Sequence, residues 1–519
     1  MKRPSKTRIG YVVLGFIGFL IAAVAAFYFF GRKPLSNYVA RTVLRSLQER
    51  FGSDAKFASL EISVYPSVHV TGTGLVIRVP GRDAYPPLIR VKSFTLEGSV
   101  VQLMQPTPEF SRLHLEGLEI HIPPKDQALA HDVTHLETSH VRFKIGLVEA
   151  NEAVLYVMGH SPERPGLEFD IHELRMKNFR SDASSSFHAV LTNPKPVGDI
   201  ETDGEFGPWN TDEPAQTPVS GQYQFSNADL STLGGIAGSL SSKGKFDGVI
   251  DTISVTGETE TPDFSFRVSG HVFPLTTDYD AVVDGTNGNV ELKSVHAHFL
   301  DTSLVASGSV AKEPGEADRR IDLDVYSETA RVEDLLRLAV SSPKPVLTGS
   351  ANLKMNVALD LHKGQNTFQH LYVAGEFGVG GAKFTSDTVQ SKIDSLSKHG
   401  LGEPDSDDDS PAVSDLKGVF KLEHATMNFS QLSFAVEGAA INLTGKYGLE
   451  DQSLDFQGSL KLQAKLSQTQ TGLKSVFLKL VDPLFEKDGA GTFVPIHITG
   501  TRSSPVFGVE IHHVQIQAH

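Results

Sequence analysis

Apolar and polar residues alternate with a period of two along most of the chain. The clearest runs lie at 62–70, 141–147, 167–171 and 454–466, where most second positions are apolar. Such alternation is typical of strands with one apolar face and one solvent-facing face. Turn-forming residues such as Asp284-Gly285 separate the runs at short intervals. The pattern therefore predicts a mainly β fold built as a meander of antiparallel strands.

The alternating runs nominate a set of residues for one shared apolar face. A closed barrel or sandwich would bury such faces against each other, whereas a long curved sheet would leave an apolar trough. A trough would suit lipid acyl chains, whose burial contributes about 0.8 kcal/mol per methylene. The alternation alone does not choose between the two. The residues predicted to line the face are Val141, Phe143, Ile145, Leu147, Leu167, Phe169, Ile171, Phe429, Phe434, Leu454, Phe456, Leu460 and Leu462.

Few segments carry helical spacing. Helices are predicted over 331–340, 387–398 and 472–485. The stretch 193–217, rich in Pro and Gly, is predicted to be a long loop or linker, and 403–410 a solvated acidic loop.

The N-terminus departs from the strand pattern. Residues 9–30 form an uncharged apolar run that is long enough to cross about 30 Å of hydrocarbon as a helix. Basic residues precede it, which predicts a cytoplasmic tail at 1–8 with the bulk of the chain outside. A cleaved signal peptide is the alternative, because Ala23-Val24-Ala25 fits a cleavage site. The predicted membrane-anchor side chains are Tyr11, Leu14, Phe16, Phe19, Leu20, Phe27 and Phe30.

A short amphipathic helix is predicted within 31–52, just outside the membrane. It could lie on lipid headgroups or cap the domain that follows. We expect the β body to occupy 53–385 and a C-terminal β region with short helices to occupy 386–519.

Composition and charge mainly exclude classes of function. The 519-residue chain has no cysteine, which excludes disulfides, thiolate nucleophiles and Cys-type metal sites. Its net charge of −15 is unfavourable for binding nucleic acid. No nucleophile elbow, phosphate-binding loop or zinc-protease motif is present. His296 and His298 share one face of a predicted strand but have no evident third ligand. We therefore predict no catalytic, cofactor-binding or metal-binding residues.

Diffuse motifs occur along the chain: Tyr65-Pro66-Ser67 after the predicted juxtamembrane helix, Asp284-Gly285-Thr286-Asn287-Gly288 in the middle, and Val494-Pro495-Ile496 with Gly500-Thr501 near the C-terminus. They resemble those of the AsmA-like family of Gram-negative bacteria, in its acidobacterial type. The resemblance spans essentially the whole chain. It implies an elongated, curved antiparallel sheet forming a groove, attached to the inner membrane by one N-terminal transmembrane helix, with the bulk in the periplasm.

Two functions follow from the resemblance and the apolar face. The first is binding of phospholipid acyl chains in a β-groove, in support of phospholipid transport to the outer membrane or of its integrity. The second is a non-enzymatic envelope scaffold that assists outer-membrane protein assembly through envelope protein partners. An anchored carbohydrate-active enzyme would need a cleft with paired carboxylates, and no residue pattern nominates one.

Overall fold

A computed structural model describes most of the chain beyond residue 54. The described residues are 55–56, 58–63, 67–77, 86–87, 89–99, 102, 109–122, 144–157, 167–180, 182–208, 216–267, 269–285, 287–312, 319–339, 341, 344–360, 370–401, 414–463, 493–502 and 504–509. The predicted tail, membrane segment, juxtamembrane helix, acidic loop and third helix lie outside these ranges. Within them, no helix is both long and apolar enough to span a membrane.

The chain divides into two compact units. The first comprises residues 1–233, 238–261 and 278–290, and the second comprises 234–237, 262–277 and 291–519. This division differs from the predicted boundary between residues 385 and 386. The strands that begin in the first unit are β1 (Ala55–Lys56), β2 (Ser59–Ser63), β3 (Val68–Ile77), β4 (Ile89–Gly98), β5 (Glu109–Ile122), β6 (Lys144–Val157), β7 (Leu167–Arg180), β8 (Ser185–Pro194), β9 (Val197–Phe206), β10 (Pro218–Asp229), β12 (Ser239–Val249), β13 (Thr252–Phe266) and β15 (Asn289–Phe299).

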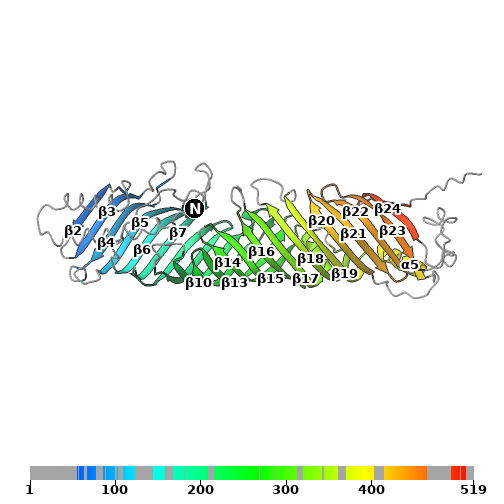
Figure 1. The fold of residues 1–519 in the computed structure, drawn as a ribbon, viewed down its shortest axis with the longest axis horizontal. Helices are drawn as coiled ribbons and strands as arrows, with labels where there is room; N and C mark the ends of the chain where they lie inside the picture. Colours follow the sequence, from blue (N-terminus) through cyan, green and yellow to red (C-terminus); the bar gives the residue numbers. More distant parts are fainter. Residues whose placement is uncertain are drawn as a thin grey trace, which may run out of the picture. The chain divides into compact units, whose positions relative to one another are not determined.

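The second unit holds the remaining strands and both described α-helices. A 3-10 helix, η3 (Leu230–Leu233), belongs to the first unit, and the α-helices are α4 (Val332–Ala339) and α5 (Asp387–Leu401). Figure 1 shows the strands of each unit running side by side in chain order. The strands that begin in the second unit are β11 (Ile236–Ala237), β14 (Val272–Asp284), β16 (Thr302–Ala311), β17 (Arg320–Arg331), β18 (Leu347–Asp360), β19 (Leu371–Phe384), β20 (Ser414–Glu423), β21 (Thr426–Val436), β22 (Ala439–Gly448), β23 (Ser453–Leu462), β24 (Phe493–Thr501) and β25 (Ser504–Val509).

All 25 described strands belong to one sheet. From β16 to β25 each strand pairs antiparallel with the next one along the chain, so the predicted meander is confirmed there. In the first unit β5 and β6 run parallel, with Phe110 opposite Ile145. Strands that run parallel cannot be joined by a tight hairpin, and residues 123–143 connect these two. The mainly β, predominantly antiparallel prediction is confirmed.

The strand β9 corrects the prediction of a loop at 193–217. Val197–Phe206 pairs along its full length with β8 and also with β10. Its apolar residues, Val197, Ile200 and Phe206, are few, and Gly204 takes one of the alternate positions between Ile200 and Phe206. A strand with so few apolar residues shows little of the alternation by which strands are recognised. The Pro and Gly residues around it therefore led to the prediction of a loop.

A fully buried apolar core lies in β3–β6 of the first unit. Val70, Phe94, Leu113 and Ile145 are each at most 2% exposed. The register places Val70 opposite Leu96, which continues the same face.

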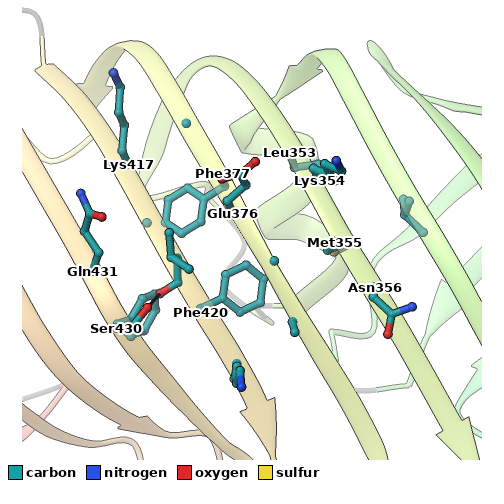
Figure 2. A pocket seen from close by; sticks show the side chains of 18 of the residues that line it. Leu353, Lys354, Met355, Asn356, Glu376, Phe377, Lys417, Phe420, Ser430 and Gln431 are labelled. Carbon is teal, nitrogen blue, oxygen red and sulfur yellow. Dashed lines mark hydrogen bonds between the residues drawn. The ribbon is translucent and has the colours of Figure 1, made fainter.

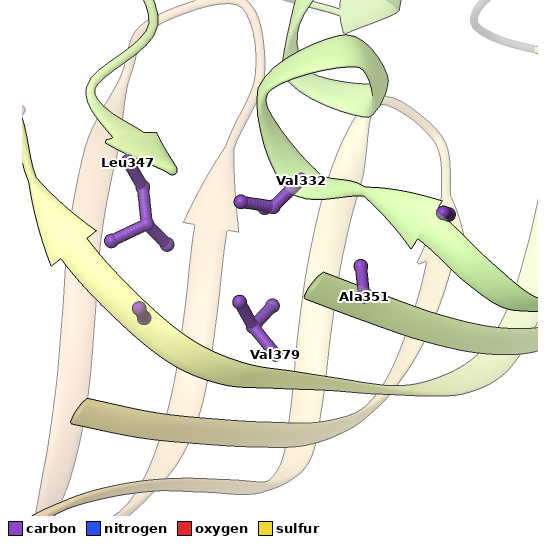
Figure 3. Packing of buried hydrophobic residues seen from close by; sticks show 6 residues of the cluster. Val332, Leu347, Ala351 and Val379 are labelled. Carbon is purple, nitrogen blue, oxygen red and sulfur yellow. The ribbon is translucent and has the colours of Figure 1, made fainter. Parts of the chain in front are cut away.

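Both predicted helices in the described region are confirmed, and they pack on the sheet of the second unit. Helix α4 contributes Val332 to a buried cluster with Leu347, Ala351 and Val379. Figure 3 shows these four side chains pointing toward one another, with Val332 at the start of the helix. Helix α5 packs Ile393 and Leu396 in the same way against a second cluster that includes Val436, Ala439 and Leu462. Each helix therefore buries a hydrophobic cluster against one end of the strands in the second unit.

Candidate functional site

The register of the second unit aligns apolar residues into rows that cross neighbouring strands. One row crosses eight strands, from β17 to β24, because each member is the direct partner of the next. Directly paired residues point to the same face of a sheet, so the row defines an apolar face. Its members, in strand order, are Val325, Met355, Gly375, Phe420, Phe429, Gly445, Phe456 and Ile498.

Parallel rows on either side widen this surface. We call the whole set the apolar face of unit 2. It consists of the row above together with Leu323, Leu353, Val357, Val373, Phe377, Val379, Leu416, Leu422, Met427, Leu432, Phe434, Ile441, Leu443, Tyr447, Leu454, Leu460 and Ile496.

Four aromatic rings run across the middle of the face. The ring centroids of Phe377 and Phe420 are 6.1 Å apart, those of Phe420 and Phe429 are 6.3 Å apart, and those of Phe429 and Phe456 are 5.7 Å apart. Glycines lie among them, and Gly418 is the direct cross-strand partner of Phe377. These separations are typical of aromatic pairs in contact. The rings therefore form a continuous aromatic strip.

The opposite face of the same strands is polar. Lys417, Lys421 and Glu376 alternate with the apolar residues and are exposed. Lys446 and Asp455 form an ion pair across β22 and β23, with nitrogen and oxygen 3.5 Å apart. Val419 is an apolar residue on this polar face, and it is 39% exposed.

The apolar face is covered unevenly. Along one end, α4 and α5 pack on Leu416, Phe434 and Leu460. In the middle, Met355, Phe377, Phe420, Phe429 and Leu443 remain partly exposed. The helices thus bury one end of the face and leave part of the aromatic strip accessible.

An open cavity of about 1760 Å³ lies against the middle of these strands, and its lining contains residues of both faces. Figure 2 shows Phe377 and Phe420 on neighbouring strands, with Lys417 and Gln431 nearby. Lys417 and Phe420 belong to opposite faces by the register, because successive side chains of a strand alternate. Because its lining mixes residues of both faces, the cavity does not by itself define an apolar site. The strand register does, since it assigns each residue to one face of the sheet.

The predicted residues of the second unit all lie on its apolar face or at the end of it. Phe429 and Phe456 belong to the aromatic strip, and Leu454 lies opposite Tyr447. Phe434, Leu460 and Leu462, in contrast, pack in the cluster beneath α5. These three residues form part of the protein's own core.

The residues of the first unit that were predicted to share one apolar face do not all lie on the same face. Ile145 is fully buried in the core. Leu147, which was expected to share its face, lies opposite Arg112 and Lys177 and therefore faces the polar side. The reason is a break in alternation at this level, since Val148 takes the buried position instead.

The other predicted residues of the first unit lie on β7 or outside the described ranges. Phe169 and Ile171 are partly buried, opposite Leu155 and Ala153. Leu167 begins β7. Val141, Phe143 and all seven membrane-anchor residues lie outside the described residues.

A cluster of hydroxyl groups in the first unit was not predicted. Tyr223 forms hydrogen bonds with Ser242 and with Tyr279, and Ser242 also donates to the carbonyl of Glu258. Burial raises the pKa of the Tyr223 hydroxyl above its ordinary value. These residues come from four strands, so no local sequence signal could have joined them.

Comparisons with known proteins return no relative. No family model matches the chain, and no curated protein or solved structure is similar to it. The AsmA-like resemblance therefore stays a prediction.

Proposed function

We propose that the protein binds lipid acyl chains on the apolar face of unit 2, without catalysing a reaction. The observation that carries this proposal is the aromatic strip of Phe377, Phe420, Phe429 and Phe456, whose first three rings are partly exposed while Phe456 is buried. The polar opposite face keeps the other side of the sheet compatible with water. Large apolar side chains left accessible beside one another mark a surface that gains free energy by being covered.

An acyl chain fits this surface in chemistry and in energy. The strip offers hydrocarbon and rings without a hydrogen-bonding group, so it can cover methylenes but cannot orient a polar substrate. Burial of each methylene contributes about 0.8 kcal/mol, so about ten methylenes would contribute about 8 kcal/mol before the cost of ordering the chain.

The setting of this activity follows the sequence prediction. We propose that residues 9–30 anchor the protein in the inner membrane and that the sheet lies in the periplasm. Phospholipid bound there would support transport to the outer membrane or its integrity, as the AsmA-like resemblance implies.

The scaffold function is the second candidate. It is favoured by one observation, the packing of α4 and α5 on the end of the apolar face. A face filled by the protein's own side chains would leave no room for lipid and would serve only as a core. In that case the functional surface would be a patch that contacts envelope proteins.

The test is uptake of a fluorescent phospholipid by the full-length, delipidated protein. Phe420→Asp places a charge on the aromatic strip, and we expect it to reduce uptake strongly. Val419→Asp is the matched control, because Val419 is the next residue along the strand and points to the polar face. Equal uptake by the two variants, or none by the unaltered protein, would rule the proposal out.

A further inference from the structure

Three potential metal ligands meet on the polar face of β8 and β9 in the first unit. His188 on β8 lies directly opposite Asp203 on β9, and Glu201 precedes Asp203 by two residues and so shares its face. One ligand atom from each residue lies within 4.8 Å of the other two. This cluster is remote in sequence from the apolar face of unit 2, and the lipid proposal does not use it.

The donor set points to a transition metal. Calcium and magnesium prefer oxygen ligands alone, whereas zinc accepts an imidazole nitrogen together with carboxylate oxygens. In a tetrahedral zinc site with bonds of about 2.0–2.1 Å, neighbouring ligand atoms are about 3.3 Å apart. Nδ1 of His188 and Oδ1 of Asp203 are 2.9 Å apart, so a small rotation of the side chains would admit the ion. The metal would replace the proton that these two atoms now share.

The charges around the cluster favour a cation. Two carboxylates and one imidazole converge, and the arginine opposite His188 on β7 is engaged elsewhere. Arg175 is the cross-strand partner of His188, but its guanidinium contacts Glu173 at 2.9 Å and Glu149 at 3.7 Å. A divalent ion between the carboxylates would relieve their mutual repulsion.

The surroundings allow an ion to enter and to complete its coordination. The side chains of His188 and Asp203 are 30% and 56% exposed. On the other side of β9, Gln222 lies opposite Asp203 and Gln224 lies opposite Glu201. These exposed amides and water can supply the remaining oxygen ligands.

We propose that His188, Glu201 and Asp203 bind one Zn²⁺ ion, which links β8 to β9. His172 and His298 are also exposed, but they differ from His188. Each is hydrogen-bonded to a hydroxyl group and not to a carboxylate. His298 is therefore a matched control for a histidine on the surface of a strand.

The test is equilibrium dialysis of the untagged full-length protein against micromolar ZnCl₂, with bound zinc measured by mass spectrometry. We expect one equivalent of zinc in the unaltered protein and in His298→Ala, and binding weaker by about tenfold or more in His188→Ala. Glu201→Gln preserves the size of the side chain and should weaken binding in the same way. Circular dichroism checks that each variant is folded.

Two results would overturn the proposal. One is the absence of saturable zinc binding by the unaltered protein. The other is binding that His188→Ala and Glu201→Gln leave unchanged. Phospholipid uptake by His188→Ala should equal that of the unaltered protein, which keeps this test separate from the lipid proposal.

Discussion

The ring of Phe377 lies over Gly418, its direct partner on the neighbouring strand. A Cβ atom built on Gly418 would approach the ring to 2.5 Å, closer than van der Waals contact allows. Gly418→Ala should therefore displace the ring and lower the free energy of unfolding by about 1–3 kcal/mol, as overpacking does. Urea denaturation measures the change.

Gly380→Ala is the control for this substitution. A Cβ atom on Gly380, in the strand β19 that carries Phe377, would meet its nearest neighbour, Oγ of Ser350, at 3.5 Å. We expect little change in stability there. An equal loss at both positions would show that the ring contact is not the cause.

Helix α4 is tied to the sheet by a buried carboxylate. Asp334 accepts hydrogen bonds from the backbone N–H of Asp301 at 3.0 Å and from the Thr302 hydroxyl at 2.9 Å. Asp334→Ala should leave both donors without this acceptor and lower the free energy of unfolding by about 1–3 kcal/mol. The exposed Glu328→Ala is the control, and thermal denaturation should separate the two variants clearly.

Stability should also depend on pH through Glu333 at the start of α4. Burial opposes ionisation of Glu333, but the N–H of Gly349 and the guanidinium of Arg331 outweigh it, so the pKa lies below its ordinary value of 4.5. A depressed folded-state pKa gives stability that is present above the unfolded pKa and is lost as the pH falls through the folded value. Glu333→Gln should therefore be less stable than the unaltered protein at pH 7, and the difference in stability should narrow as the pH falls below 4.5 and through the lowered folded-state pKa. A gap that stays constant with pH would contradict this assignment.

The covered end of the apolar face should behave differently from its middle. Leu396→Ala removes packing between α5 and the side chains of Phe434 and Leu460. We expect it to lower the free energy of unfolding by about 1–2 kcal/mol. Phospholipid uptake should not fall, because the aromatic strip is unaltered. A loss of uptake at unchanged stability would instead place α5 in the binding surface.

The sequence predicts the architecture well where alternation is strong. Leu454 and Phe456 were assigned to one face from period two alone, and β23 has that pattern. The same reasoning failed at Leu147, because the alternation is broken beside Gly146 and the next buried position after Ile145 is Val148. Alternation does not reveal such a break, since a glycine fits either face.

Features that depend on which strands pair, or on how a helix packs, could not be predicted from the sequence. The parallel pairing of β5 with β6 depends on the path of the connection between them. The zinc candidate depends on the register that places His188 opposite Asp203, whereas the spacing of histidines had drawn attention to His296 and His298. The covering of Phe434 by α5 likewise required the packing of the helix.

The central claim is tested most directly by site-specific photocrosslinking in cells. A photoreactive phenylalanine analogue at position 420 should crosslink to phospholipid, and the same analogue at position 419, on the polar face, should not. Crosslinks at position 420 to a protein alone, or equal lipid labelling at the two positions, would contradict the account.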